Sequence, residues 1–152
     1  MKKILALVLS VFAVFSLAGC ASSSDDLTIT NAWVRASEYS DHVGGMTGIF
    51  AELTNNTDHD ITLTGGETDI APMVQTHEVV EGMMQERKGG IVVKAHETVT
   101  LEPGGLHVML MNLTKPIVVG DKITFTFTTD HGKQTFELTA KESGGGDETY
   151  NK

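Results

Sequence analysis

The feature that most limits the fold of this chain is the spacing of turn residues between positions 27 and 140. Gly, Asn and Asp recur there roughly every eight to twelve residues, a spacing typical of β-sandwiches and barrels. The intervening segments are rich in Thr, Val, Ile and Phe, residues that favour strands. No segment has convincing helical periodicity. The sequence therefore predicts an all-β domain.

Strict alternation is clearest near the end of this region, where Ile123, Phe125 and Phe127 alternate with threonines. The segments expected to form strands are 27–35, 48–54, 61–64, 73–80, 83–87, 91–93, 98–101, 106–112, 122–129 and 134–139. The glycine pair after position 64 is expected to end one of them. We count eight or nine independent strands in this set, which predicts a Greek-key β-sandwich over residues 27–140.

The first nineteen residues have the layout of an export signal. Two lysines precede an apolar run over residues 4–17, which is shorter than the ~20 residues of a membrane-spanning helix. Leu-Ala-Gly-Cys at 17–20 resembles the bacterial lipobox, which implies cleavage before Cys20 and lipid on its thiol. We expect a polar tether over 20–26 and a disordered tail over 141–152. The protein is then exported and anchored to the outer face of the bacterial cytoplasmic membrane or in the periplasm.

Cysteine content and charge exclude several classes of function. Cys20 is the only cysteine, so a lipidated chain has neither a disulfide nor a thiolate metal ligand. This rules out a blue-copper electron-transfer site, which needs a cysteine. The net charge of −9 disfavours nucleic acid as a partner. No arrangement of acids or Ser, His and Asp indicates catalysis, so we do not expect an enzyme.

Methionines crowd around two histidines in the second half of the domain. In the segment 106–112, His107 and Met109 are two residues apart, so they point to the same face of a strand, with Cα atoms ~6.6 Å apart. If Glu81-Gly82 forms a two-residue turn, Met84 shares a face with His77. A three-residue loop would shift the register by one residue and place Met83 there instead.

The chemistry of these donors selects the metal. Thioethers are soft ligands that suit Cu(I), and imidazole binds copper in either oxidation state. The candidate Cu(I) ligands are therefore His77, Met84, His107 and Met109. Three further methionines are additional or substitute candidates, namely Met83, Met46 and Met111. The four remaining histidines lie beside polar residues in turns or at strand ends and are expected to be solvated: His42, His59, His96 and His131.

The chain also resembles the periplasmic copper chaperones called PCuAC, over about 110 residues. The resemblance is carried by these pieces: Trp33-Val34-Arg35-Ala36, Thr76-His77-Glu78, Met84, Arg87, Gly89-Gly90-Ile91 and Leu101-Glu102-Pro103-Gly104-Gly105-Leu106-His107-Val108-Met109-Leu110-Met111. Only six residues separate His77 from Met84, whereas the family has about ten, which indicates a shorter hairpin tip.

This resemblance implies a cupredoxin-like sandwich that holds one Cu(I) between a His and a Met from each of two segments. It also implies delivery of copper to an acceptor such as the CuA centre in subunit II of cytochrome c oxidase, sometimes with a Sco-type protein. A copper storage or resistance protein remains an alternative. So does a lipid-anchored interaction module in which these side chains only pack.

Overall fold

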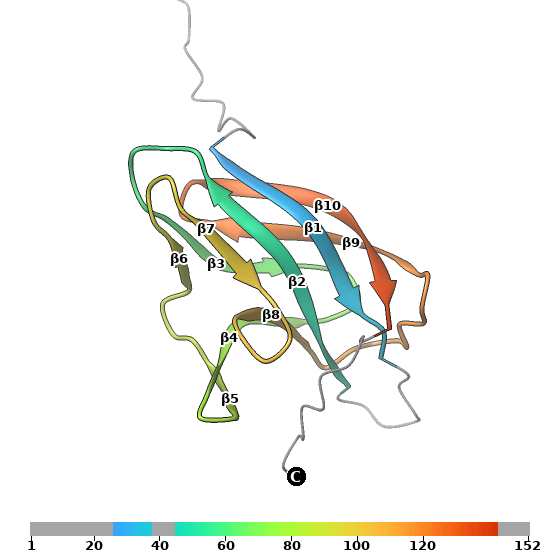
Figure 1. Ribbon diagram of the computed structural model, residues 1–152. Helices are drawn as coiled ribbons and strands as arrows, with labels where there is room; N and C mark the ends of the chain where they lie inside the picture. The colour runs from blue at the N-terminus through green and yellow to red at the C-terminus, as the bar shows by residue number, and fades with distance from the viewer. Residues whose placement is uncertain (1–25, 38–44, 143–152) are drawn as a thin grey trace, which may run out of the picture.

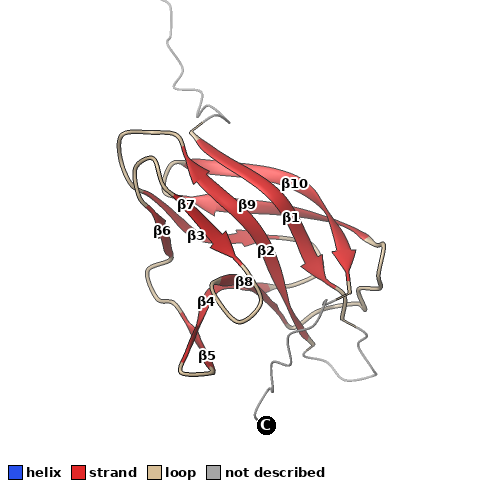
Figure 2. Ribbon diagram, viewed as in Figure 1, coloured by secondary structure: helices blue, strands red, loops and turns tan. Residues whose placement is uncertain are grey.

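A computed structural model of the protein describes residues 26–37 and 45–142. The expected signal peptide, the lipidated Cys20, His42 and the tail beyond Glu142 lie outside the described residues. No helix within the described ranges could span a bilayer. The described residues form strands and loops, as Figure 2 shows. The all-β prediction is confirmed.

The described part of the chain contains ten strands, rather than the eight or nine that the turn pattern predicted. They are β1 (Leu27–Arg35), β2 (Met46–Asn55), β3 (Ile61–Glu67), β4 (Met73–Val80), β5 (Met83–Glu86), β6 (Ile91–Val93), β7 (Thr98–Leu101), β8 (His107–Met111), β9 (Lys122–Thr129) and β10 (Gly132–Lys141). The count is higher because even the shortest segments, β5, β6 and β7, each pair with a longer strand. β10 runs to Lys141, which pairs with Arg35 of β1.

The strands follow one hydrogen-bonded path in the order β5-β4-β8-β2-β1-β10-β9-β3-β6, with β7 paired to β2. The parallel pairing of β1 with β10 joins the first and last strands, and the path bends there into two layers (Figure 1). Consecutive strands such as β2 and β3 therefore lie in different layers, as in a Greek-key sandwich. A bulge in β1 between Thr30 and Trp33 explains why its apolar alternation is imperfect.

The glycine pair Gly65-Gly66 does not end β3, contrary to the expectation from sequence. The strand continues to Glu67, and an irregularity in its pairing with β9 lies between Leu63 and Gly65. A Cβ atom on Gly66 would lie 2.1 Å from the ring of Phe125. Glycine is therefore needed inside the strand, because the ring of a buried phenylalanine occupies the space of a side chain.

The hydrophobic core lies between the two layers. Strand β8 presents one face to this core and the other to the outside of its layer. Val108 and Leu110 belong to the core cluster, whereas Met109 is only 1% exposed yet lies outside that cluster. Because successive residues of a strand point to opposite faces, Met109 is buried on the outer face of its layer. This outer face carries the candidate site.

Candidate metal centre

Three neighbouring strands, β2, β8 and β4, present the candidate ligands on one outer face, with β5 at the sheet edge. His77 of β4 lies directly opposite His107 of β8. One step along, Met109 lies between Gln75 of β4 and Gly48 of β2. The antiparallel pairing therefore brings both histidines and Met109 together from two segments about thirty residues apart.

The ring of His107 is oriented by the turn that precedes β8. Gly105 N–H donates to the Glu102 carbonyl (3.1 Å), and Gly104 has a φ of 78°, as a type II turn with Pro103 at its second position requires. This turn presents the Gly105 carbonyl, which accepts a hydrogen bond from Nδ1 of His107 at 3.0 Å. The proton is thereby held on Nδ1, so Nε2 carries the lone pair that a metal needs.

His77 is held in a complementary way. Its Nε2 donates to Oε1 of Gln75 at 3.1 Å, which leaves Nδ1 as the lone-pair nitrogen. That Nδ1 is buried and has no hydrogen-bond partner within the described residues. Such an atom is costly in a folded protein unless something binds it. The ring centroids of the two histidines are 5.7 Å apart.

The electrostatics of His77 also favour metal binding. Burial lowers its pKa below the ordinary value, the neighbouring His107 lowers it further, and Glu86 partly opposes both effects. A lowered pKa keeps the imidazole neutral at pH 7. The neutral ring is the form that binds metal ions.

An aromatic wall closes the β2 side of this site. The ring of Phe50 extends over Gly48, where an added Cβ would lie 2.7 Å from it. Phe50 is 3% exposed, stacks on Trp33 at a centroid distance of 4.6 Å, and has its ring centroid 6.2 Å from that of His107. Glycine at position 48, which pairs with Met109, therefore leaves room for a buried aromatic ring.

The β4–β5 hairpin decides which of two adjacent methionines faces the site. Both Glu81 and Gly82 have positive φ (52° and 79°), which makes a two-residue type I′ turn. Val79 then pairs with Met84, and Val80 with Met83, so the register predicted from a two-residue turn is confirmed. Met84 shares the face of His77 and is half-buried, whereas Met83 points to the other face and is 65% exposed.

The opposite face of the hairpin is braced by polar side chains. Arg87 forms an ion pair with Glu78, and its Nε donates to the Gly90 carbonyl at 3.0 Å. Gln85 donates to the same carboxylate at 3.1 Å. The hydrogen bond from Arg87 lowers the pKa of Glu78. We call these contacts of Glu78, Gln85 and Arg87 the brace. They fix the position of β5 relative to β4, and with it the position of Met84.

Replacing Arg87 with alanine is expected to weaken Cu(I) binding by up to ~10-fold, the lower end of the range for residues that orient metal ligands. A Cu(I) competition titration measures the affinity, and the proton chemical shifts of the Met84 methyl report its position. Lys88→Ala is the matched control, because it removes a neighbouring cation outside the brace. An Arg87→Ala protein with unchanged affinity and unchanged Met84 shifts would contradict a positioning role.

The donor set on this face is two imidazoles and two thioethers. Within the described ranges, no group of three or more His, Cys, Asp or Glu could hold a metal ion. A site with three or four protein ligands at this face would therefore include methionine sulfur. Such a set suits a soft ion, and Cu(I) in particular.

Three more methionines form a row beside this site. Met111 of β8 lies between Met46 of β2 and Met73 of β4, two residues along the strands from Met109. Met46 and Met73 are 45% and 42% exposed, and Met111 is half-buried. The sequence predicts Met46 and Met111 as additional candidates but does not predict Met73. Counting β4 in steps of two, from His77 through Gln75 to Met73, would have found it.

Comparisons with known proteins agree with this architecture. Residues 27–140 match a family model described as "LpqE-like: Putative lipoprotein LpqE-like". The "Putative lipoprotein Lxx21020" of Leifsonia xyli subsp. xyli is 32% identical over 132 residues, which cover 84% of this chain and 76% of the relative.

Two solved structures are similar over most of the chain. A "Copper-bound PCuAC domain from PmoF2" has a TM-score of 0.65 and 22% identity, and covers 77% of this chain and 93% of that domain. "CuI-DR1885" from Deinococcus radiodurans has a TM-score of 0.60 and 30% identity, and covers 74% and 76%. The chain therefore belongs to the LpqE-like lipoprotein family, and its described domain has the fold of PCuAC domains.

Proposed function

We propose that this protein is a copper chaperone that holds one Cu(I) between His77, His107, Met109 and Met84. The observation that carries the proposal is the cross-strand pair of His77 and His107. The ring proton of each is held on the nitrogen that donates a hydrogen bond, from His107 to Gly105 and from His77 to Gln75. The buried Nδ1 of His77, which lacks a protein partner, fits a site built for a metal. The similar structures named above are copper-bound by their titles, which supports the same metal here.

The site is suited to release as well as to binding. All four donors are neutral, so Cu(I) is held without the strong attraction of a thiolate. The methionine row of Met46, Met111 and Met73 borders the site and is partly exposed, so an acceptor could reach the metal from that side. These features favour delivery over storage.

We infer that the acceptor is another copper protein, such as the CuA domain in subunit II of cytochrome c oxidase, with a Sco-type protein as a second candidate. Lipid on Cys20 would keep the carrier at the membrane that holds such a target. β1 begins at one end of the sandwich, while the β4–β5 hairpin projects at the other end (Figure 1). An anchor that precedes β1 therefore leaves the site free to meet a partner. Copper storage is the second candidate function.

The metal-binding proposal is tested by comparing two adjacent methionines. Met84→Ala is expected to weaken Cu(I) binding at least 10-fold, because Met84 lies on the same face of the hairpin as His77, whereas Met83→Ala is expected to leave the affinity unchanged. Affinities are measured by competition with a chromogenic Cu(I) chelator on the full chain. Every variant also carries Cys20→Ser, so that no free thiol competes. Equal effects of the two changes would contradict the assigned ligand set.

Delivery requires a separate experiment. The Cu(I)-loaded chain is mixed with an apo CuA domain, and copper in each protein is measured after separation. Transfer to the CuA domain supports the chaperone role. Tight one-equivalent binding that is not given up to a CuA domain or a Sco-type protein would favour storage instead.

A further inference from the structure

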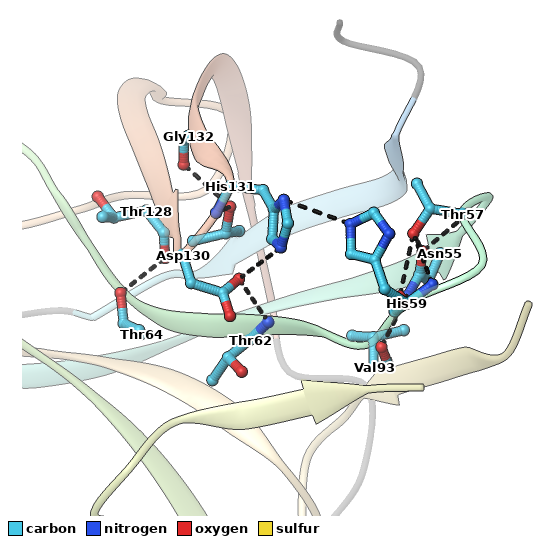
Figure 3. Close-up of polar contacts among 11 residues, drawn as sticks. Asn55, Thr57, His59, Thr62, Thr64, Val93, Thr128, Asp130, His131 and Gly132 are labelled. Atoms are coloured by element: carbon cyan, nitrogen blue, oxygen red, sulfur yellow. Dashed lines mark hydrogen bonds and ion pairs between the residues drawn. The ribbon is translucent and has the colours of Figure 1, made fainter. Parts of the chain in front are cut away.

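Two histidines that are far apart in sequence meet at the end of the sandwich where β1 begins. His59 lies in the turn between β2 and β3, and His131 lies in the turn between β9 and β10. Figure 3 shows the two rings facing each other, each carried by its own turn. Both side chains are exposed, so a solute can reach them. The face that carries His77, His107 and Met109 lies on β4 and β8, toward the β4–β5 hairpin.

The separation of the two rings fits a shared metal ion. Nε2 of His59 and Nδ1 of His131 are 3.4 Å apart, and the ring centroids are 4.5 Å apart at an interplanar angle of 38°. Two imidazole nitrogens that bind one metal at 2.0–2.1 Å lie about 2.9 Å apart at the right angle of a tetragonal site and about 3.4 Å apart at the tetrahedral angle. An ordinary hydrogen bond between nitrogen and its acceptor is shorter, at about 2.9–3.0 Å. The observed 3.4 Å is longer than this and brings the two nitrogens close enough to bind one ion.

A carboxylate lies near one of the two rings. Oδ1 of Asp130 lies 3.9 Å from Nε2 of His131 and also accepts a hydrogen bond from the Thr62 backbone N–H at 2.8 Å. The proton of His131 is thus attracted to Nε2, so that Nδ1, which faces His59, carries the lone pair. A carboxylate behind a histidine is the usual outer partner of a metal-binding imidazole.

The turn that carries His59 is also fixed by hydrogen bonds. The His59 carbonyl accepts hydrogen bonds from Nδ2 of Asn55 (2.7 Å) and from Oγ1 of Thr57 (3.0 Å). Asn55 is 1% exposed and also donates to the Val93 carbonyl at 2.9 Å. The backbone that carries His59 is therefore anchored in the edge of the core. The turns that carry the two histidines are therefore each fixed by their own hydrogen bonds.

We propose that His59 and His131 form a second metal site, one that takes a divalent late transition ion and Cu(II) in preference. The two imidazoles supply two ligands. Water fills the other positions, because the described residues contain no group of three His, Cys, Asp or Glu that could complete the set. Nitrogen donors without sulfur favour Cu(II) over Cu(I), and Cu(II) is bound most tightly among the divalent ions of the first row. The site is independent of the thioether site in position and in ligand chemistry.

The test uses the full chain with Cys20→Ser, His107→Ala and Met109→Ala, which removes the thiol and disables the Cu(I) site. Titration with Cu(II), followed by calorimetry and electron paramagnetic resonance, should give one equivalent with hyperfine coupling to two imidazole nitrogens. His59→Ala and His131→Ala are each expected to weaken this binding at least 10-fold. Asp130→Asn, which keeps an acceptor for Thr62, should weaken it less than either histidine change.

His96→Ala is the matched control, because this third exposed histidine at the same end bonds to Asp58 and should not affect binding. Cu(II) binding that persists after both His59→Ala and His131→Ala would overturn the proposal, as would the absence of a stoichiometric site in the parent. In a chain with an intact thioether site, His59→Ala should leave Cu(I) affinity unchanged. The experiments can therefore contradict the proposal for either metal site without contradicting the other.

Discussion

Replacing His107 with alanine is expected to weaken Cu(I) binding more than ~100-fold, because outer partners of metal ligands already account for 10- to 100-fold and His107 is proposed as a direct ligand. Its Nδ1 proton is held by the Gly105 carbonyl, which directs Nε2 toward the metal. Alanine removes this nitrogen and leaves His77 opposite an empty position. The affinity is measured by Cu(I) competition titration in the Cys20→Ser background.

Loss of folding must be separated from loss of a ligand. His107 is 3% exposed, so its removal also leaves a small cavity on the outer face. Near-ultraviolet circular dichroism and thermal unfolding of the metal-free variant check that the sandwich persists. His96→Ala, an exposed histidine outside the proposed metal sites, is the control and should bind Cu(I) normally. A folded His107→Ala protein with normal affinity would place the metal elsewhere.

Replacing Phe50 with alanine is expected to lower the free energy of unfolding by about 3–5 kcal/mol. The ring is 3% exposed, stacks on Trp33, and has the Arg35 guanidinium 5.2 Å from its centroid. Removing it leaves a cavity that Gly48, which has no side chain, cannot fill. Since domains of this size are stable by only about 5–15 kcal/mol, the loss is a large fraction of the total.

The same change is expected to loosen the metal site, because the Phe50 ring packs next to His107. Urea unfolding of the metal-free chain measures stability, and competition titration measures Cu(I) affinity. Phe136→Ala is the comparison, since this ring is only half-buried at the edge of the core and should cost less. A Phe50→Ala chain with the urea midpoint and the Cu(I) affinity of the parent chain would contradict the role of the ring as a wall of the site.

Local rules were sufficient for part of the candidate site. His107 and Met109 share a face because a strand has a side-chain period of two, whatever it pairs with. Met84 shares a face with His77 because Glu81-Gly82 forms a two-residue turn, and turn length sets hairpin register. Both relations depend on neighbours within a few residues, so the sequence predicts the first and limits the second to two registers.

Local rules failed where a distant side chain decided the outcome. Gly65-Gly66 has the composition of a turn, yet β3 continues through it, and the ring of Phe125 fills the space where a side chain at position 66 would lie. His59 and His131 were expected to be solvated. They are exposed, but they also contact each other across 72 residues of chain. A sequence contains no local signal for either contact.

Strand period and residue composition are enough to predict the all-β class, the face shared by His107 and Met109, and the donor types that suit Cu(I). Pairing in the folded protein placed His77 opposite His107 and Met84 on the face of His77. It also placed three methionines in a row across β2, β8 and β4, with Phe50 beside the site. The physical reason is that strand parity and turn length act over a few residues. Pairing between distant strands is instead chosen by burial of the whole core, on which the order of strands in the sheet depends.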